Sequence, residues 1–99
     1  MGRGKRKTIL SVMTDNMDEC IVCHRPREQI HHIFTASNRA KADKYGYVIP
    51  LCAEHHTGST GVHSIREMDV YWRQKAQMHF ETYYGTREDF IKEFGKSWI

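Results

Sequence analysis

Apolar residues are grouped differently in the two halves of the chain. Two stretches in the first half, 28–34 (EQIHHIF) and 47–51 (YVIPL), are rich in β-branched and aromatic residues, which is typical of strands. The stretch between them, 37–46 (SNRAKADKYG), predicts a short helix, with Ser37 as its N-cap and Gly46 as its end.

The second half carries a longer apolar pattern at helical spacing. Its apolar residues recur every three or four positions, so they share one face of a helix predicted over residues 64–84. They are Ile65, Met68, Trp72, Ala76, Phe80 and Tyr83. We expect Trp72 and Phe80 to be buried in the core. By contrast, His79 borders this face and is expected to be a core histidine.

Capping signals mark the beginning of both C-terminal helices. Ser64 and Glu67 have the spacing of a capping box. A second helix is predicted over 86–95, where Thr86 is followed by Asp89 in place of the usual Glu or Gln. Its apolar residues are Phe90, Phe94 and Trp98. The expected fold class is therefore α+β, with a small two-stranded unit and two C-terminal helices packed on it.

The length of 99 residues corresponds to one domain, and its positive charge is concentrated near the N-terminus. Four basic residues supply a charge of +4, namely Arg3, Lys5, Arg6 and Lys7. The other 11 basic and 12 acidic residues sum to −1. We expect a basic arm over 1–18 and a single domain over 19–99. Such an arm can bind the phosphate backbone of nucleic acid, or it can be a solvated tail.

Membrane and secretory features are missing from the sequence. No apolar run approaches the roughly 18 residues of a membrane helix, and the basic N-terminus lacks the apolar segment of a secretory signal. A cytoplasmic location is therefore expected. In a reducing compartment, the three cysteines favour metal binding over a disulfide framework.

All three cysteines belong to two pairs with metal-ligand spacing. Two residues separate Cys20 from Cys23, and two separate Cys52 from His55. This gap lets both side chains of a tight turn point toward one ion, so the two pairs complete a tetrahedral set of three thiolates and one imidazole. Soft sulfur with borderline nitrogen suits zinc as the structural metal. His24 is an alternative fourth ligand, although a solvent-facing position is favoured.

Four other histidines surround this unit and are not needed for the zinc. They are His31, His32, His56 and His63. In a strand, adjacent side chains point to opposite faces, so His31 and His32 are expected to have different roles. One suits a metal ligand and the other a neutral imidazole that activates water near pH 7. Imidazoles around an ion with an open position can polarise a phosphate.

The combined pattern, C-x2-C … HHIF … VIPLC-x2-HH … GVH, resembles the HNH endonucleases of the His-Me finger (ββα-metal) type. The resemblance is to the zinc-knuckle form that is common in phage and prophage genomes, and it covers residues 20–63. The C-terminal segment also resembles the tail of small phage HNH-like proteins. The resemblance implies two strands followed by a helix, with a metal ion held between them.

The resemblance also implies a role for each spare histidine. It implies that His31 and His56 are ligands of a catalytic divalent ion, with His63 as a further ligand, and that His32 is the general base. Mg, Mn, Ni and Zn are candidate ions, and three imidazoles would favour Zn, Ni or Mn over Mg. The cysteine set with His55 matches the structural zinc site of the family.

One position departs from the family's pattern. These proteins usually carry an Asn five residues before the LC cysteine, and this chain has Tyr47 there. Asn38, in a longer insertion between the strands, is a candidate catalytic substitute, and a surface position early in a helix is the alternative interpretation. The departure bears directly on whether the site can catalyse.

Basic residues outside the arm fall into two groups. The group between the two histidine pairs is a candidate for phosphate contacts and consists of Arg39, Lys41 and Lys44. The group on the long helix is expected to be a solvated face and consists of Arg66, Arg73 and Lys75.

Two functions are compatible with these features. The first is a metal-dependent HNH-type endonuclease that hydrolyses phosphodiester bonds of DNA, double-stranded and with little sequence specificity. The alternative is a non-catalytic, zinc-stabilised module of phage origin that binds DNA or a protein. A structural part of a larger phage complex is compatible with either. No membrane partner is expected, and the sequence leaves the oligomeric state open.

Overall fold

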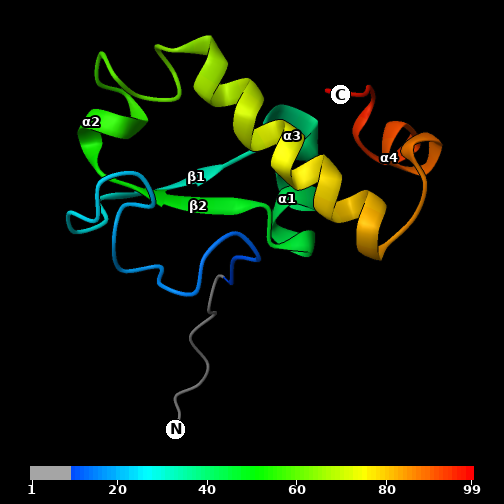
Figure 1. The fold of residues 1–99 in the computed structure, drawn as a ribbon, viewed down its shortest axis with the longest axis horizontal. Helices are drawn as coiled ribbons and strands as arrows, with labels where there is room; N and C mark the ends of the chain where they lie inside the picture. The colour runs from blue at the N-terminus through cyan, green and yellow to red at the C-terminus, as the bar shows by residue number, and fades with distance from the viewer. Residues whose placement is uncertain (1–9) are drawn as a thin grey trace, which may run out of the picture.

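The computed structural model describes residues 10–99, so the basic residues at positions 3–7 lie outside the described part. A two-stranded antiparallel sheet flanked by helices forms the fold (Figure 1), which confirms the α+β class. The elements are β1 (Gln29–His32), a 3-10 turn η1 (Ala36–Asn38), α1 (Arg39–Tyr45), β2 (Val48–Leu51), α2 (Ala53–His56), α3 (Arg66–Tyr83) and α4 (Arg87–Phe94).

The strand register pairs both histidines of β1 with the first half of β2. His31 lies opposite Ile49, and His32 lies opposite Val48. All four residues of β2 are buried, whereas His31 is the one buried residue of β1. The two histidines therefore have different surroundings, with His31 buried and His32 partly exposed.

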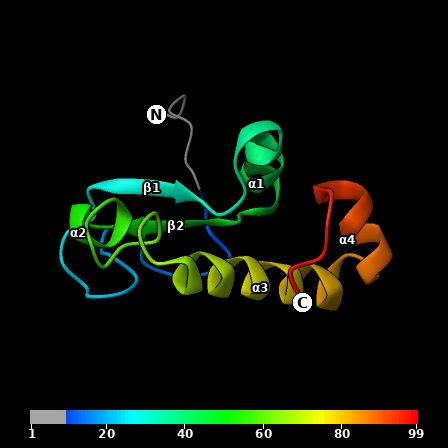
Figure 2. The same cartoon turned by 90° about the horizontal axis from the view of Figure 1, so that it is seen from above.

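Helix α3 runs along one side of the sheet, and α4 packs beyond α1 at the far end (Figure 2). Aromatic rings fill the space between these helices, with the centroids of Phe34 and Phe94 at 4.6 Å and those of Phe90 and Phe94 at 4.8 Å. We call this part the aromatic end. Its rings belong to Phe34, Tyr45, Tyr47, Phe80, Phe90 and Phe94. The opposite end of the sheet, at α2, carries the cysteines and is called the metal end.

The beginnings of α1 and α3 differ from the sequence predictions. Helix α3 begins at Arg66, and its N-cap Ile65 makes no side-chain bond, so the predicted capping box of Ser64 is wrong. The N–H groups of Ser64 and Ile65 bond the carbonyl of Gly61 in a turn, so the helix begins only after this turn. Helix α1 begins after η1 with Asn38 as its N-cap, so Ser37 does not cap it.

Two other predicted helix ends are confirmed. Gly46 ends α1 in the left-handed region, with φ of 79°. At the start of α4, Thr86 and Asp89 bond each other's backbone N–H in a capping box.

The apolar face of α3 is buried only in its middle. Phe80 is buried as predicted, but Trp72 is only partly buried, so that part of the prediction is wrong. Tyr83 is 70% exposed, because the last turn of α3 extends past the core.

The described end of the N-terminal segment is joined to the domain. Ser11 donates a side-chain hydrogen bond to the carbonyl of Val48, and the N–H of Val12 bonds the carbonyl of Gly46. These bonds hold the chain against the turn that links α1 to β2. Within residues 10–99, no helix has the length and apolar character needed to cross a membrane.

Candidate metal centres and histidine cleft

Four ligand atoms converge at the metal end, and we call this group the cysteine tetrad. It consists of Cys20, Cys23, Cys52 and His55, whose ligand atoms lie within 4.8 Å of one another. The Sγ atoms of Cys23 and Cys52 are 3.7 Å apart. Tetrahedral zinc with Zn–S bonds of about 2.3 Å places its sulfurs about 3.8 Å apart. The tetrad therefore fits a structural zinc ion, as predicted from its spacing.

The tight turn that holds the first cysteine pair is fixed by its own backbone. The N–H of Cys20 bonds the carbonyl of Arg25 at 2.7 Å, and the N–H of His24 bonds the carbonyl of Cys20. His24 adopts a positive φ of 68°, and its side chain is 77% exposed, beside Glu19. His55 completes the tetrad, with Nδ1 3.3 Å from Sγ of Cys52.

Arg25 favours the thiolate form of one cysteine. The backbone N–H and then the guanidinium of Arg25 lower the pKa of Cys23 to about 6, and Nε of Arg25 lies 3.3 Å from its Sγ. The thiolate is the form that binds zinc, so this ligand is prepared for metal at neutral pH.

A second group of ligand atoms is formed only by imidazoles, and we call it the histidine triad. Its members are His31 from β1, His56 from α2 and His63 from the following loop. Nε2 of His56 and Nε2 of His63 are 3.2 Å apart, close to the roughly 3.3 Å that tetrahedral geometry gives with Zn–N bonds of about 2.0 Å. The triad therefore fits a divalent ion and supplies three protein ligands, which is the number typical of catalytic zinc sites.

Burial keeps two members of the triad, His31 and His56, in the neutral form that binds metal. Burial, followed by the neighbouring His56 and His63, lowers the pKa of His31 to about 3. Burial and then His63 also lower the pKa of His56. A neutral imidazole offers a free nitrogen lone pair, which is the form that coordinates a metal ion.

The loop after α2 is folded back tightly enough to bring His63 to the other two histidines. The N–H of His63 bonds the carbonyl of His56 at 3.2 Å. A Cβ at Gly61 would lie 2.7 Å from the carbonyl carbon of His55, so a larger residue would push the loop away. The carboxylate of Glu54 accepts bonds from the backbone N–H and hydroxyl of Thr60, which closes the loop on α2.

His32 lies beside the triad with a partner that sequence reasoning missed. Its Nε2 is 2.8 Å from Oδ1 of Asp43 on α1. His32 and the triad line one cleft of about 310 Å³ together with Arg39, and we call it the histidine cleft. The sequence offered one signal for Asp43, its place in the helix between the two histidine pairs. Only the strand register and the direction of α1 bring it to His32.

The other predicted site residues in the insertion point elsewhere. Asn38 donates its amide to the carbonyl of Phe94 at 2.9 Å, and Lys41 donates to the carbonyl of Glu93. Lys44 is exposed, with Nζ 5.2 Å from the ring centroid of Tyr45. Among the candidate residues of this insertion, Arg39 is the one that lines the histidine cleft.

Tyr47, at the position where the resemblance suggests Asn, belongs to the aromatic end. It is fully buried, and its hydroxyl lies 3.1 Å from Nδ1 of His79. Burial raises the pKa of Tyr47, which keeps the hydroxyl protonated. His79 is half-buried with this partner, consistent with the core role expected for it.

Two arginines of α3 also reach the triad, although the sequence predicted a solvated face. Arg66 and Arg73 line a cavity of about 300 Å³ together with His31 and His63. Helical spacing alone could not place these arginines beside the triad, because their position depends on how α3 packs along the sheet.

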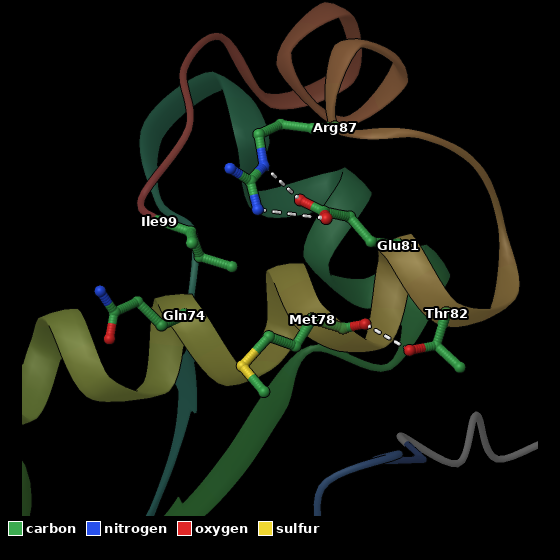
Figure 3. Close-up of a pocket in the computed structure, with 6 residues that line it drawn as sticks. All are labelled: Gln74, Met78, Glu81, Thr82, Arg87 and Ile99. Carbon is green, nitrogen blue, oxygen red and sulfur yellow. Dashed lines mark hydrogen bonds and ion pairs between the residues drawn. The ribbon is translucent and has the colours of Figure 1, made fainter.

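A larger cavity, of about 450 Å³, lies between α3 and the C-terminal residues (Figure 3). An ion pair between Arg87 and Glu81, with Nε 3.0 Å from Oε2, closes one side, and Met78 and Ile99 provide apolar lining. The two metal-ligand groups lie elsewhere, so the candidate chemistry is at the metal end.

Comparisons of the chain with protein-family models, curated proteins and solved structures gave no match. The interpretation of the site therefore rests on its own geometry.

Proposed function

We propose that this chain is a metal-dependent endonuclease of the HNH type that hydrolyses phosphodiester bonds of DNA in the histidine cleft. The observation that carries the proposal is the convergence of His31, His56 and His63 beside His32. Two paired strands followed by α2 support this proposal because a ββα-metal finger has that order, and the cysteine tetrad would hold its structural zinc.

The residues of the cleft divide the chemistry among them. The triad would hold a divalent ion, which when bound supplies Lewis acidity toward a phosphate oxygen and stabilises a leaving oxygen. His32 acts as the general base. When its Nε2–H donates to Asp43, Nδ1 is the nitrogen that takes the proton of the attacking water.

DNA is the proposed substrate, double-stranded and with little sequence preference. Arg39 is exposed at the edge of the cleft and can pair with a backbone phosphate. Phosphate contacts carry no direct sequence information. The basic residues of the arm would add sequence-independent affinity if they reach the same strand.

A second function is favoured by one observation: the family's Asn position holds Tyr47, and Asn38, its candidate substitute, points away from the cleft. Tyr47 is buried against His79, and Asn38 bonds the carbonyl of Phe94. A cleft that lacks the Asn side chain of the family's pattern would suit a zinc-stabilised module that binds DNA or a protein without cutting it.

Plasmid cleavage with a panel of divalent ions distinguishes these functions. We expect the zinc-loaded protein to nick plasmid only when Mg, Mn, Ni or additional Zn is present. His32→Ala should reduce the rate by about 10²- to 10⁴-fold, the usual contribution of a positioned general base.

Two further variants complete the cleavage experiment. His56→Ala should lose the second metal together with activity, whereas His24→Asn should leave both unchanged, because His24 is exposed on the outside of the tight turn. Retained cleavage in His32→Ala would remove that residue from the base role. DNA binding without cleavage by any ion, with one metal bound per chain, would favour the binding module.

A further inference from the structure

The triad is bordered by two cavities, and the groups proposed for catalysis lie in the histidine cleft. His31, Thr35 and His63 line both the histidine cleft and the cavity on the α3 side. A ligand that contacts the triad can therefore extend into both. The α3 cavity adds Arg66 and Arg73, and neither belongs to the expected nucleic-acid surface.

Arg73 is held in place by contacts that use only part of its hydrogen-bonding capacity. Its Nε–H donates to Oδ1 of Asp69 at 3.0 Å, and its guanidinium lies 4.5 Å from the ring centroid of Trp98. Trp98 is itself tied to α3, because its N–H bonds the side chain of Gln77 at 2.7 Å. The side chain of Arg73 is 18% exposed, and its terminal Nη groups have no hydrogen-bond partner within residues 10–99.

The charge of this cavity favours an anion. Arg66 and Arg73 contribute +2 and Asp69 contributes −1, which leaves +1 before any ion is bound at the triad. The hydroxyls of Thr35 and Ser64 also line the cavity and offer further donors. A pre-oriented guanidinium with free N–H groups matches the geometry of phosphate oxygens.

We propose that Arg66 and Arg73 form a phosphate-binding subsite on the α3 side of the histidine triad, which holds a backbone phosphate of the DNA strand next to the phosphate that the triad contacts. This subsite rests on the proposed function, since it requires the strand to cross the triad. It makes α3 part of the DNA-binding surface and gives the strand a fixed path between Arg39 and Arg73.

Binding of a short fluorescent DNA duplex tests the subsite without requiring catalysis. Kd is measured for the zinc-loaded chain across a salt series with no added divalent ion. Arg66→Gln is the main variant, because Arg66 is exposed and makes no side-chain hydrogen bond or ion pair in the described chain that a substitution would break. We expect Kd to rise about fivefold or more at low salt, and the salt slope to fall by about one.

Two companion variants test whether weaker binding comes from a lost phosphate contact, from lower net charge or from unfolding. Lys75→Gln removes the same charge from the same helix, but Lys75 lies over the ring of Tyr71 outside this cavity, so Kd should change less than about twofold. Arg73→Lys keeps the charge but loses the planar donor geometry, so it should weaken binding while thermal unfolding shows a folded domain.

The possible outcomes separate the subsite from the nuclease. Equal Kd values for Arg66→Gln, Arg73→Lys and Lys75→Gln would overturn the subsite, and so would a wild-type chain that binds no duplex. Weakened binding in Arg66→Gln without cleavage by any metal would support the subsite and overturn the nuclease. Cleavage with an unchanged KM in both arginine variants would support the nuclease and overturn the subsite.

Discussion

At the metal end, polar side chains crowd around two groups of ligand atoms, whereas at the aromatic end rings pack against one another with few polar atoms between them. The two ends share one small sheet (Figure 1). Around the tetrad and triad, the chain consists of a tight turn, a four-residue helix and a glycine-containing loop. Around Phe34 and Phe90, it consists of three helices joined by buried rings.

This difference indicates where the folding free energy comes from at each end. Buried rings gain stability from apolar area and dispersion, with no need for a ligand. The short turn, helix and loop of the metal end gain less in this way to offset their loss of conformational entropy, so we expect a bound ion to stabilise this end. At this end, the buried His31 shares a cleft with the half-buried His56 and the exposed His63.

Removing a tetrad ligand should have the largest effect. Cys52→Ala should lose its zinc and the folded structure of the metal end, because structural zinc binding contributes about 10–16 kcal/mol of apparent free energy in small zinc domains. Metal content by mass spectrometry and near-UV circular dichroism measure both losses. Full zinc occupancy in Cys52→Ala would contradict the assignment.

Removing a ring from the aromatic end should cost less and should spare the metals. Phe90 is fully buried between Phe94 and Phe80. Phe90→Ala should lower the free energy of unfolding by about 3–5 kcal/mol, as for other buried aromatics. Chemical denaturation measures this, with Ile91→Ala, an exposed neighbour, as the control. A folded Phe90→Ala chain without zinc would mean that the two ends are not separable.

Asp43 should affect activity while both ends stay intact. Asp43→Ala removes the acceptor that orients His32, so kcat should fall about 10- to 100-fold, the range seen when partners of functional histidines are lost. KM should stay within about twofold, because Asp43 carries no contact to the phosphates in this proposal. Asp43→Asn keeps an oxygen acceptor and should retain more activity. A change confined to KM would indicate a role in substrate binding instead.

The sequence predicted most of the local structure because the signals are local. The spacing of Cys20 and Cys23 marks a metal site through the geometry of one turn. Strand alternation predicted different surroundings for His31 and His32, and Thr86 with Asp89 marked the start of α4. Where the pattern was wrong, at Ser64, the carbonyl of Gly61 already binds the N–H of Ser64 that the Glu67 side chain would accept in a capping box.

The missed residues belong to contacts between distant elements. Asp43 reaches His32 because α1 leads back to the sheet, and Arg73 lines a cavity with His31 because α3 runs along the sheet. Asn38 had the right chemistry for a catalytic amide, but in the structure it bonds the carbonyl of Phe94, 56 positions away. Such contacts depend on tertiary packing, which residue type and spacing do not encode in one sequence.

Acid should destabilise the aromatic end to a small and separable extent through His79. Burial lowers the pKa of His79, which lies among Tyr47, Tyr83 and Tyr84. The unfolded chain therefore binds this proton more readily than the folded chain. The stability that neutral His79 contributes is complete above the ordinary histidine pKa of about 6.5 and is lost as the pH falls through the folded-state pKa.

His79→Gln isolates this effect, because glutamine does not titrate and its oxygen can accept the hydroxyl hydrogen of Tyr47. Between pH 7 and pH 5, the wild-type chain should lose stability relative to His79→Gln by less than about 1.4 kcal/mol per pH unit, the limit for one proton. Urea unfolding of both zinc-loaded chains measures the difference, and proton competition at the tetrad cancels because both chains share it. If the free energy of unfolding changed equally with pH in both chains, His79 would make no contribution, and the acid sensitivity would belong to the metal end.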